Sequence, residues 1–126
     1  MLYYQEFSEW LDQQLNKDLP EGVVAFNFNL YEGASDTPEY HIELIGADYF
    51  DEDDDDWPGN EVFTTRDDLF IIKRTEDISR WKKGLKLMTS LVSKYLQDGK
   101  YADKLKGAEA VGIGFVDGDL HILHRS

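Results

Sequence analysis

Apolar residues recur every four positions near the start of the chain, which is the spacing of one face of an α-helix. The stripe consists of Tyr3, Phe7, Leu11 and Leu15, with Trp10 beside it. Pro20 and Gly22 are residues that terminate helices. The pattern predicts an amphipathic N-terminal helix, and we interpret Trp10 as a core residue.

The next two segments alternate between large apolar side chains and smaller or polar ones, the pattern of a half-buried strand. In residues 23–31 the large members of the alternation are Val24, Phe26, Phe28 and Leu30. In residues 40–46, Tyr40, Ile42 and Leu44 alternate with His41, Glu43 and Ile45. Turn-forming residues at 32–39 separate the two segments, so we expect an antiparallel hairpin.

The second half of the chain begins with two short apolar runs, residues 62–65 and 69–73, separated by a turn at 66–68. At least one run is expected to be a strand, and the second is rich in β-branched residues. Farther along, residues 101–106 predict a short helical turn that ends at Gly107.

The longest regular pattern predicts a helix between Asp77 and Gly99. Its apolar positions are spaced 3, 4, 3, 4 and 3 residues apart: Ile78, Trp81, Leu85, Met88, Val92 and Tyr95. Asp77 is a suitable N-cap, and Gly99 is suitable for a left-handed C-cap. Gly84 weakens the helix and is interpreted as a point of close packing.

The C-terminal segment predicts a second hairpin. Two apolar runs, 110–116 and 119–124, flank Asp117-Gly118, a dipeptide that favours a two-residue type I′ turn. Such a turn would pair Phe115 with Leu120 and Ile113 with Ile122. Gly112 and Gly114 indicate that another segment of the protein approaches this strand closely.

Together these elements predict a single α+β domain that spans residues 1–126. We expect an antiparallel sheet of four to six strands, with the long helix and the N-terminal helix packed against it. The strand order is not deducible from the pattern.

One stretch, residues 48–61, fits neither a helix nor a strand. It contains the residues Asp48, Asp51, Glu52, Asp53, Asp54, Asp55, Asp56 and Glu61, and no Lys or Arg. Consecutive aspartates repel one another and compete with their own backbone for hydrogen bonds, and Trp57-Pro-Gly-Asn60 favours a turn. We therefore predict a solvated loop between two folded blocks and call residues 48–61 the acidic loop.

Charge is distributed unevenly along the chain, whose formal net charge is −13. Residues 1–61 hold 17 acidic residues and one lysine, whereas residues 62–126 hold 9 acidic and 12 basic residues. A surface of this sign repels nucleic acid and anionic lipid and attracts basic proteins. The alternative explanation is that the negative charge only keeps the protein soluble. This alternative explains the total charge better than it explains the clustering of acidic residues in one loop.

The sequence contains few residues suited to catalysis, and we expect no enzymatic activity and no cofactor. Cysteine is absent, and the serines are not part of a recognisable nucleophile motif. His121 and His124 are three residues apart on a predicted strand, so they face opposite sides of the sheet. No glycine-rich phosphate loop is present.

Divalent cations are the serious chemical alternative for the acidic loop. Asp51 to Asp56 supplies the oxygen ligands that Ca²⁺ and Mg²⁺ prefer. The spacing and central glycine of an EF-hand are missing, and consecutive aspartates cannot all converge on one ion. We therefore predict no dedicated metal site, with a cation-binding module kept as an alternative function.

Protein recognition explains the clustered charge better. A carboxylate-rich loop can occupy the basic cleft of a nuclease as a phosphate mimic, and opposite fields raise the association rate. Trp57, with Tyr49 and Phe50 at the base of the loop, supplies aromatic anchors of the kind that usually carry binding energy. The predicted partner site therefore comprises the eight acidic residues named above and Trp57.

The chain resembles the immunity proteins of contact-dependent inhibition and other polymorphic toxin systems. The resemblance is carried by residues 6–11, 24–32, 51–57 and 112–120, about a third of the chain. It implies a cytoplasmic inhibitor, without turnover of its own, that binds one cognate toxin domain. The expected toxin is basic, with a nuclease as the first candidate.

A third possible function is that of a small scaffold, including a weak homodimer formed through the C-terminal hairpin or the long helix. The N-terminus lacks the pattern of a signal peptide, and no apolar run is long enough to span a bilayer. We expect a cytoplasmic monomer or weak homodimer that binds neither nucleic acid nor membrane.

Overall fold

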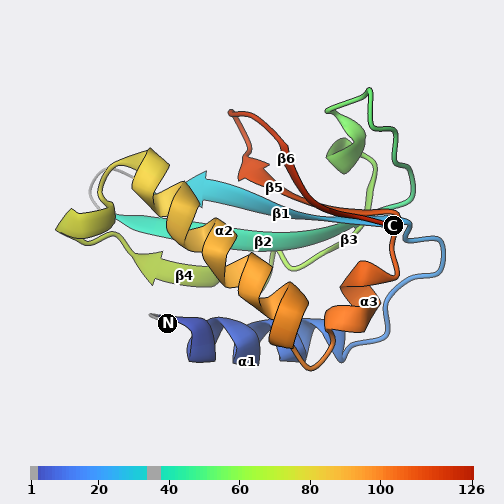
Figure 1. Ribbon diagram of the computed structural model, residues 1–126, viewed down its shortest axis with the longest axis horizontal. Coiled ribbons are helices and arrows are strands. Elements are labelled where there is room, and N and C mark those ends of the chain that lie inside the picture. The colour runs from blue at the N-terminus through green and yellow to red at the C-terminus, as the bar shows by residue number, and fades with distance from the viewer. Residues whose placement is uncertain (1–2, 34–37) are drawn as a thin grey trace.

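The computed structural model describes residues 3–33 and 38–126, and the middle of the loop predicted at 32–39 lies outside the described residues. Three helices pack on one side of a sheet (Figure 1). The helices are α1 (Tyr4–Leu15), α2 (Trp81–Asp98) and α3 (Ala102–Lys106). The strands are β1 (Ala25–Glu32), β2 (Glu39–Ala47), β3 (Glu61–Thr64), β4 (Phe70–Lys73), β5 (Ala110–Phe115) and β6 (His121–Arg125).

These elements form a mixed sheet of six strands in the order β3-β2-β1-β5-β6, with β4 paired to the other end of β2. The predicted α+β class and the hairpin of β1 and β2 are confirmed. One pairing was not predicted: β5 lies parallel to β1, with Ala25 opposite Ala110. A parallel neighbour requires a long crossover connection, and α2 lies within that connection.

The main core lies between the helices and one face of the sheet. The apolar stripe of α1 and most of the stripe predicted for α2 converge there on the even-numbered residues of β1 and β2, and Trp10 is buried as predicted. Trp81, a predicted member of the α2 stripe, is not part of this core, because its side chain is 48% exposed. Phe7 of α1 contacts three aromatic rings from other elements, those of Phe28, Phe70 and Tyr95. We call this side of the sheet the helix-covered face.

The ends of α2 differ from the prediction. Asp77 lies in a separate 3₁₀ turn, η2 (Glu76–Ile78), and α2 begins four residues later at Trp81. Gly99 follows the helix but has a φ of −69°, so it is not a left-handed cap. At Gly84, a Cβ atom would collide with the Tyr40 ring, which confirms the predicted close packing.

The C-terminal hairpin forms, but in another register. Ile113 faces His121, not Ile122, and a bulge lies between Val111 and Gly112. Among the described residues only Tyr3 and Gly22 have positive φ, so Asp117-Gly118 does not form a type I′ turn. The strands are joined instead by residues 116–120, and Ile122 is 42% exposed as a result.

None of the described helices has both the length and the apolar character needed to cross a membrane.

Candidate functional site

The acidic loop lies over the face of the sheet opposite the helices (Figure 1). We call this face of the sheet the open face. Its two ends are joined by a hydrogen bond of 3.2 Å from the Asp48 amide to the Asn60 carbonyl. Inside the loop, the carboxylates of Asp51 and Asp54 accept hydrogen bonds of 2.9 Å from the amides two residues ahead. These Asx turns fix the backbone that four consecutive aspartates would otherwise disorder.

Trp57 does not lie on the surface, so its predicted role as an exposed partner anchor is wrong. Its side chain is 1% exposed and packs on the open face in a small cluster with Ala25, Ile45, Ala47 and Ala110. The three alanines leave the space that the indole ring fills, so burial of apolar area fastens the loop to the sheet. The predicted turn does form, as the 3₁₀ turn η1 (Trp57–Gly59).

The other aromatic residues of the loop have different surroundings. The Phe50 ring meets Trp57 edge-on at 5.3 Å between centroids, and the Arg125 guanidinium lies over the Phe50 ring, 4.8 Å from its centroid. Tyr49 is 40% exposed and is therefore the aromatic side chain of the loop that a partner can reach.

Most of the loop's charge is not neutralised within the protein. Glu52 pairs with Arg125 and Glu61 with Arg66, both at 2.7 Å, and Glu61 belongs to β3. Within residues 3–33 and 38–126, no basic group lies within 4.0 Å of the loop's aspartates, which are Asp48, Asp51, Asp53, Asp54, Asp55 and Asp56. The lysines of α2 do not reach the loop, because α2 lies on the other side of the sheet.

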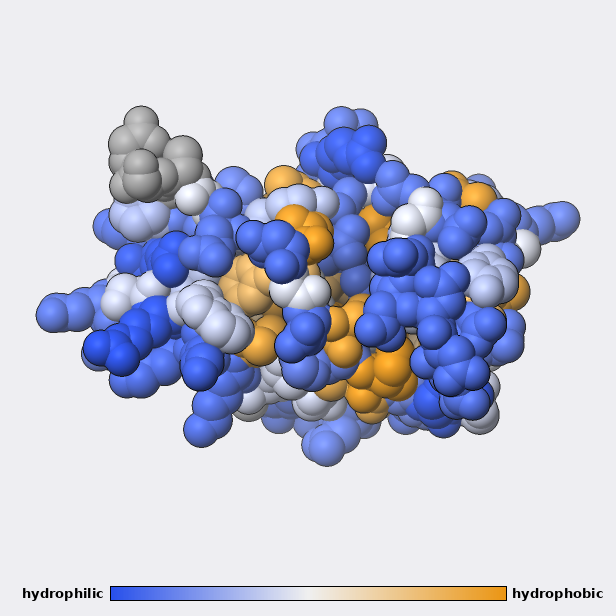
Figure 2. All heavy atoms as spheres, turned by 90° about the horizontal axis from the view of Figure 1, so that it is seen from above, coloured by the Kyte–Doolittle hydropathy of each residue, from blue (hydrophilic) through white to orange (hydrophobic). Residues whose placement is uncertain are grey.

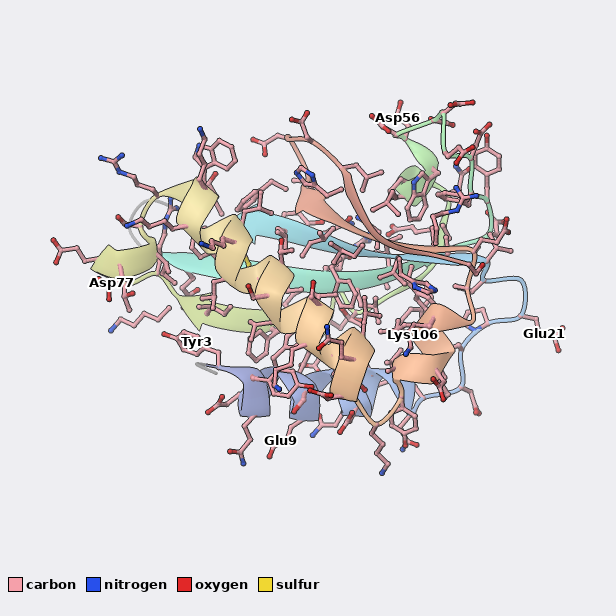
Figure 3. All side chains as sticks on the ribbon, in the orientation of Figure 1. Tyr3, Glu9, Glu21, Asp56, Asp77 and Lys106 are labelled. Carbon is pink, nitrogen blue, oxygen red and sulfur yellow. The ribbon has the colours of Figure 1, made fainter. Side chains whose placement is uncertain are left out.

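Figure 3 shows Asp56 projecting away from the sheet on the side opposite the helices, whereas Asp77 and Glu9 lie far from it. Figure 2 views the molecule from this side and shows hydrophobic side chains in the middle, flanked by hydrophilic ones. Two exposed apolar residues of this region belong to the hairpin, Val116 and Ile122. Negative charge and apolar surface thus occur on one side of the molecule.

Between the acidic loop and the 116–120 connection lies a groove of about 490 Å³. Its floor is the open face of β1, β2 and β5, where Asn27, Asn29, Tyr31 and Glu43 alternate with the core residues of the same strands. Asp55, Asp56 and Asp119 line it from the flanking loops. The charged loop is therefore one wall of a polar groove.

Glu43 is the centre of a hydrogen-bond network in the groove, and the residue is only 1% exposed. One carboxylate oxygen accepts from the Tyr31 hydroxyl at 2.7 Å and from the Asn29 amide at 3.1 Å. The other accepts from the Thr64 hydroxyl and lies 3.7 Å from Nε of Arg66. Burial, together with the hydrogen bond to Glu43, raises the pKa of the Tyr31 hydroxyl to about 12.

Asn27 extends the network but leaves one atom without a partner. Its Nδ2 donates to Oδ1 of Asn29 at 2.6 Å, whereas its buried Oδ1 has no hydrogen-bond donor among the described residues. A Cβ atom at Gly112 would lie 2.5 Å from this oxygen and 3.3 Å from Trp57, so a larger residue at that position requires the buried Asn27 side chain to move. The close approach predicted at Gly112 is confirmed, with a neighbouring segment of the chain as the approaching group.

Sequence reasoning missed the groove. The alternation had placed Asn27, Asn29 and Tyr31 on one face of β1, and Glu43 on the corresponding face of β2. The available signal was two asparagines and a glutamate at alternating positions of two adjacent predicted strands. The pattern did not predict that the acidic loop folds back over these residues and encloses them in a groove.

The histidines are dispersed rather than gathered into a site. His41 lies 3.1 Å from Glu39, and His124 lies 3.1 Å from the Lys106 carbonyl. Across the described part of the chain, no three His, Asp or Glu side chains come together in a way that could hold a metal ion. The carboxylates of the acidic loop form no such group, so the cation-binding alternative has no preformed coordination shell among the described residues.

Comparison with known proteins gave no match to this chain among family models, curated proteins or solved structures.

Proposed function

We propose that this chain is a binding protein that uses the acidic loop to hold a basic partner protein, in the manner of an immunity protein that neutralises a toxin domain. One observation carries the proposal: the six aspartates of the loop have no cationic partner among the described residues, although the loop itself is fixed in place. Negative charge that is not paired within the protein, on a loop that is fixed in place, favours binding of positively charged side chains from another protein.

The order of the loop matters for affinity as well as for position. Trp57 is buried in the cluster on the open face, so the aspartates are held before a partner arrives. A preorganised surface loses less conformational entropy on binding than a flexible one. In this proposal Trp57 acts from inside the protein, and the apolar contacts are made by Tyr49, Val116 and Ile122.

The charge also identifies the class of partner. A field of this sign increases the rate of encounter with a basic surface such as the phosphate-binding cleft of a nuclease. The partner we propose is therefore a basic toxin domain with nuclease activity. The chain would act as a cytoplasmic inhibitor, as a monomer or weak homodimer, and would carry out no reaction itself.

The test uses the C-terminal domain of the protein encoded immediately upstream, mixed with this chain in a calorimeter at low and high salt. The variant D53N/D55N/D56N removes three exposed loop charges. We expect it to weaken binding about tenfold and to reduce the salt dependence, because three rim carboxylates no longer contribute.

The matched control is E9Q/E76Q/D77N, which removes the same charge from exposed positions outside the loop. It should change the dissociation constant by less than about threefold, since those charges lie on other parts of the molecule and the salt of the solution screens them from the contact. Equal effects of the two variants, or no association of the wild-type chain with the upstream domain, would contradict the proposal.

A further inference from the structure

We propose that the groove beside the acidic loop receives an arginine side chain of the partner, with Glu43 as its buried counter-charge. This inference rests on the proposed function, because it specifies how the basic partner is recognised. It concerns residues on the strands, whereas the proposed function depends on the exposed loop.

The charge of the groove favours a cationic guest. Its lining contains five carboxylates, those of Glu43, Asp55, Asp56, Glu61 and Asp119, and one cation, Arg66. Glu43 is 1% exposed, whereas Asp55, Asp56 and Asp119 are exposed at the rim. A cation is therefore attracted by the exposed carboxylates at the rim and then by Glu43 at the floor. The attraction to Glu43 is screened less by water, because Glu43 is buried.

Arg66 shows that a guanidinium group fits the mouth of the groove. Its guanidinium lies 2.7 Å from Glu61 and 3.7 Å from Glu43, yet its side chain is 65% exposed. An exposed side chain with one close ion pair is easily displaced. A partner's arginine can therefore replace Arg66 beside Glu43 without rearranging the sheet.

The planar shape of the guanidinium group suits the carboxylate on the floor of the groove. A guanidinium carries five N–H donors in a fork that matches the two oxygens of a carboxylate. The buried Oδ1 of Asn27, which has no donor in the described chain, does not contribute, because it lies against Gly112 and Trp57. The guest is therefore expected to bind through Glu43 and the carboxylates at the rim.

The size of the groove agrees with such a guest. About 490 Å³ lies within the range of small-ligand pockets, roughly 300 to 1,000 Å³, and exceeds the volume of one side chain. A lysine ammonium would satisfy the charge, but it is a point charge and lacks the planar fork. We therefore expect arginine to bind more tightly than lysine.

The test follows the side-chain amide signals of Asn27 and Asn29 by NMR while N-acetylarginine methylamide is added to about 50 mM, above the millimolar range expected for so small a ligand. The lysine and citrulline analogues serve as probes with a different cation and with no charge. We expect saturable shifts with the arginine compound, weaker shifts with lysine and none with citrulline.

The decisive variant is R66Q, which removes the chain's own guanidinium from an exposed position and should leave the fold intact. It should tighten binding of the arginine compound about fivefold, the factor that corresponds to one exposed ion pair no longer competing. The control is R125Q, which frees Glu52 outside the groove and should leave binding there unchanged. In E43Q the shifts should be lost.

Failure of this inference can be distinguished from failure of the proposed function. Absence of shifts at Asn27 and Asn29 in both the wild type and R66Q, or equal shifts with citrulline, would overturn the arginine site. If the upstream domain still binds through the loop in that case, the proposed function stands. Shifts that respond to R66Q as expected would support the arginine site even if the upstream domain does not bind.

Discussion

On one face of β1, Phe26, Phe28 and Leu30 are buried beneath the helices, whereas on the other face Asn27, Asn29 and Tyr31 line the groove. The same contrast continues on β2, where Ile42 and Leu44 flank Glu43. The helix-covered face is held together by apolar packing with several aromatic contacts. The open face holds a small apolar cluster at one end and a polar network beyond it.

This difference suggests that the helix-covered face stabilises the fold and that the open face binds a partner. Apolar packing of the helix-covered face provides most of the free energy of folding, because the hydrophobic effect scales with the apolar area buried. A buried carboxylate with its donors contributes less, since its desolvation offsets most of what its hydrogen bonds supply. Residues that are costly to bury and line a groove are better explained by a ligand than by the fold.

The strongest test of this division is Phe28→Ala on the helix-covered face. Phe28 is 0% exposed and lies against Phe7 with ring centroids 6.3 Å apart. Its truncation leaves a cavity in the main core and should lower the free energy of unfolding by about 3–5 kcal/mol. Urea unfolding followed by tryptophan fluorescence measures this change.

Ile71→Ala is the control for that measurement. Ile71 is on the edge strand β4 and is 53% exposed, so its truncation should change the stability by less than about 0.5 kcal/mol. Similar losses in both variants would mean that the helix-covered face is not the source of stability.

An intermediate effect is expected for Glu43→Gln on the open face. The substitution keeps the shape but replaces a charged acceptor by an amide, so Thr64 and Tyr31 lose charge-assisted hydrogen bonds. We expect a loss of about 1–3 kcal/mol in urea unfolding. Glu32→Gln, which affects the partly exposed pair with Arg74, should cost less than about 1 kcal/mol. A fully stable E43Q would show that the network is not a structural unit.

The smallest effect concerns pH. Burial raises the pKa of Tyr31 to about 12, and burial with a hydrogen bond to Asp12 raises the pKa of Tyr95 as well. An unfolded tyrosine has a pKa of about 10, so the stability linked to these shifts is complete below pH 10 and is lost as the pH rises through the folded values.

Phenolate absorbance should accordingly show late-titrating tyrosines in the folded protein, and Tyr31→Phe should remove one of them. Ile71→Ala, at an exposed residue of β4, is the control and should leave the late phase unchanged. Titration of every tyrosine near pH 10 in the folded protein would show that Tyr31 is not held by Glu43.

The sequence by itself determined which side chains are apolar on each element. The four-residue spacing in α1 and the alternation on β1 and β2 are local patterns, and both are confirmed. The stripe of α2 is confirmed from Leu85 onward, whereas Ile78 precedes the helix and Trp81 is exposed. Local charge repulsion likewise predicted that residues 48–61 form neither a regular strand nor an α-helix, which holds for all of them except Glu61, the first residue of β3. These features could be predicted because each depends on neighbours within a few residues.

Tertiary structure decided the rest: the parallel pairing of β5 with β1, the register of the C-terminal hairpin, and the burial of Trp57 against Ala25, Ala47 and Ala110. It also enclosed Glu43 and Asn27 in a groove. All of these depend on contacts between residues far apart in the chain, whose free energy is set by which surfaces meet. A tryptophan beside four aspartates has the same sequence whether it faces a partner or its own sheet, and only the space left by the alanines decides between them.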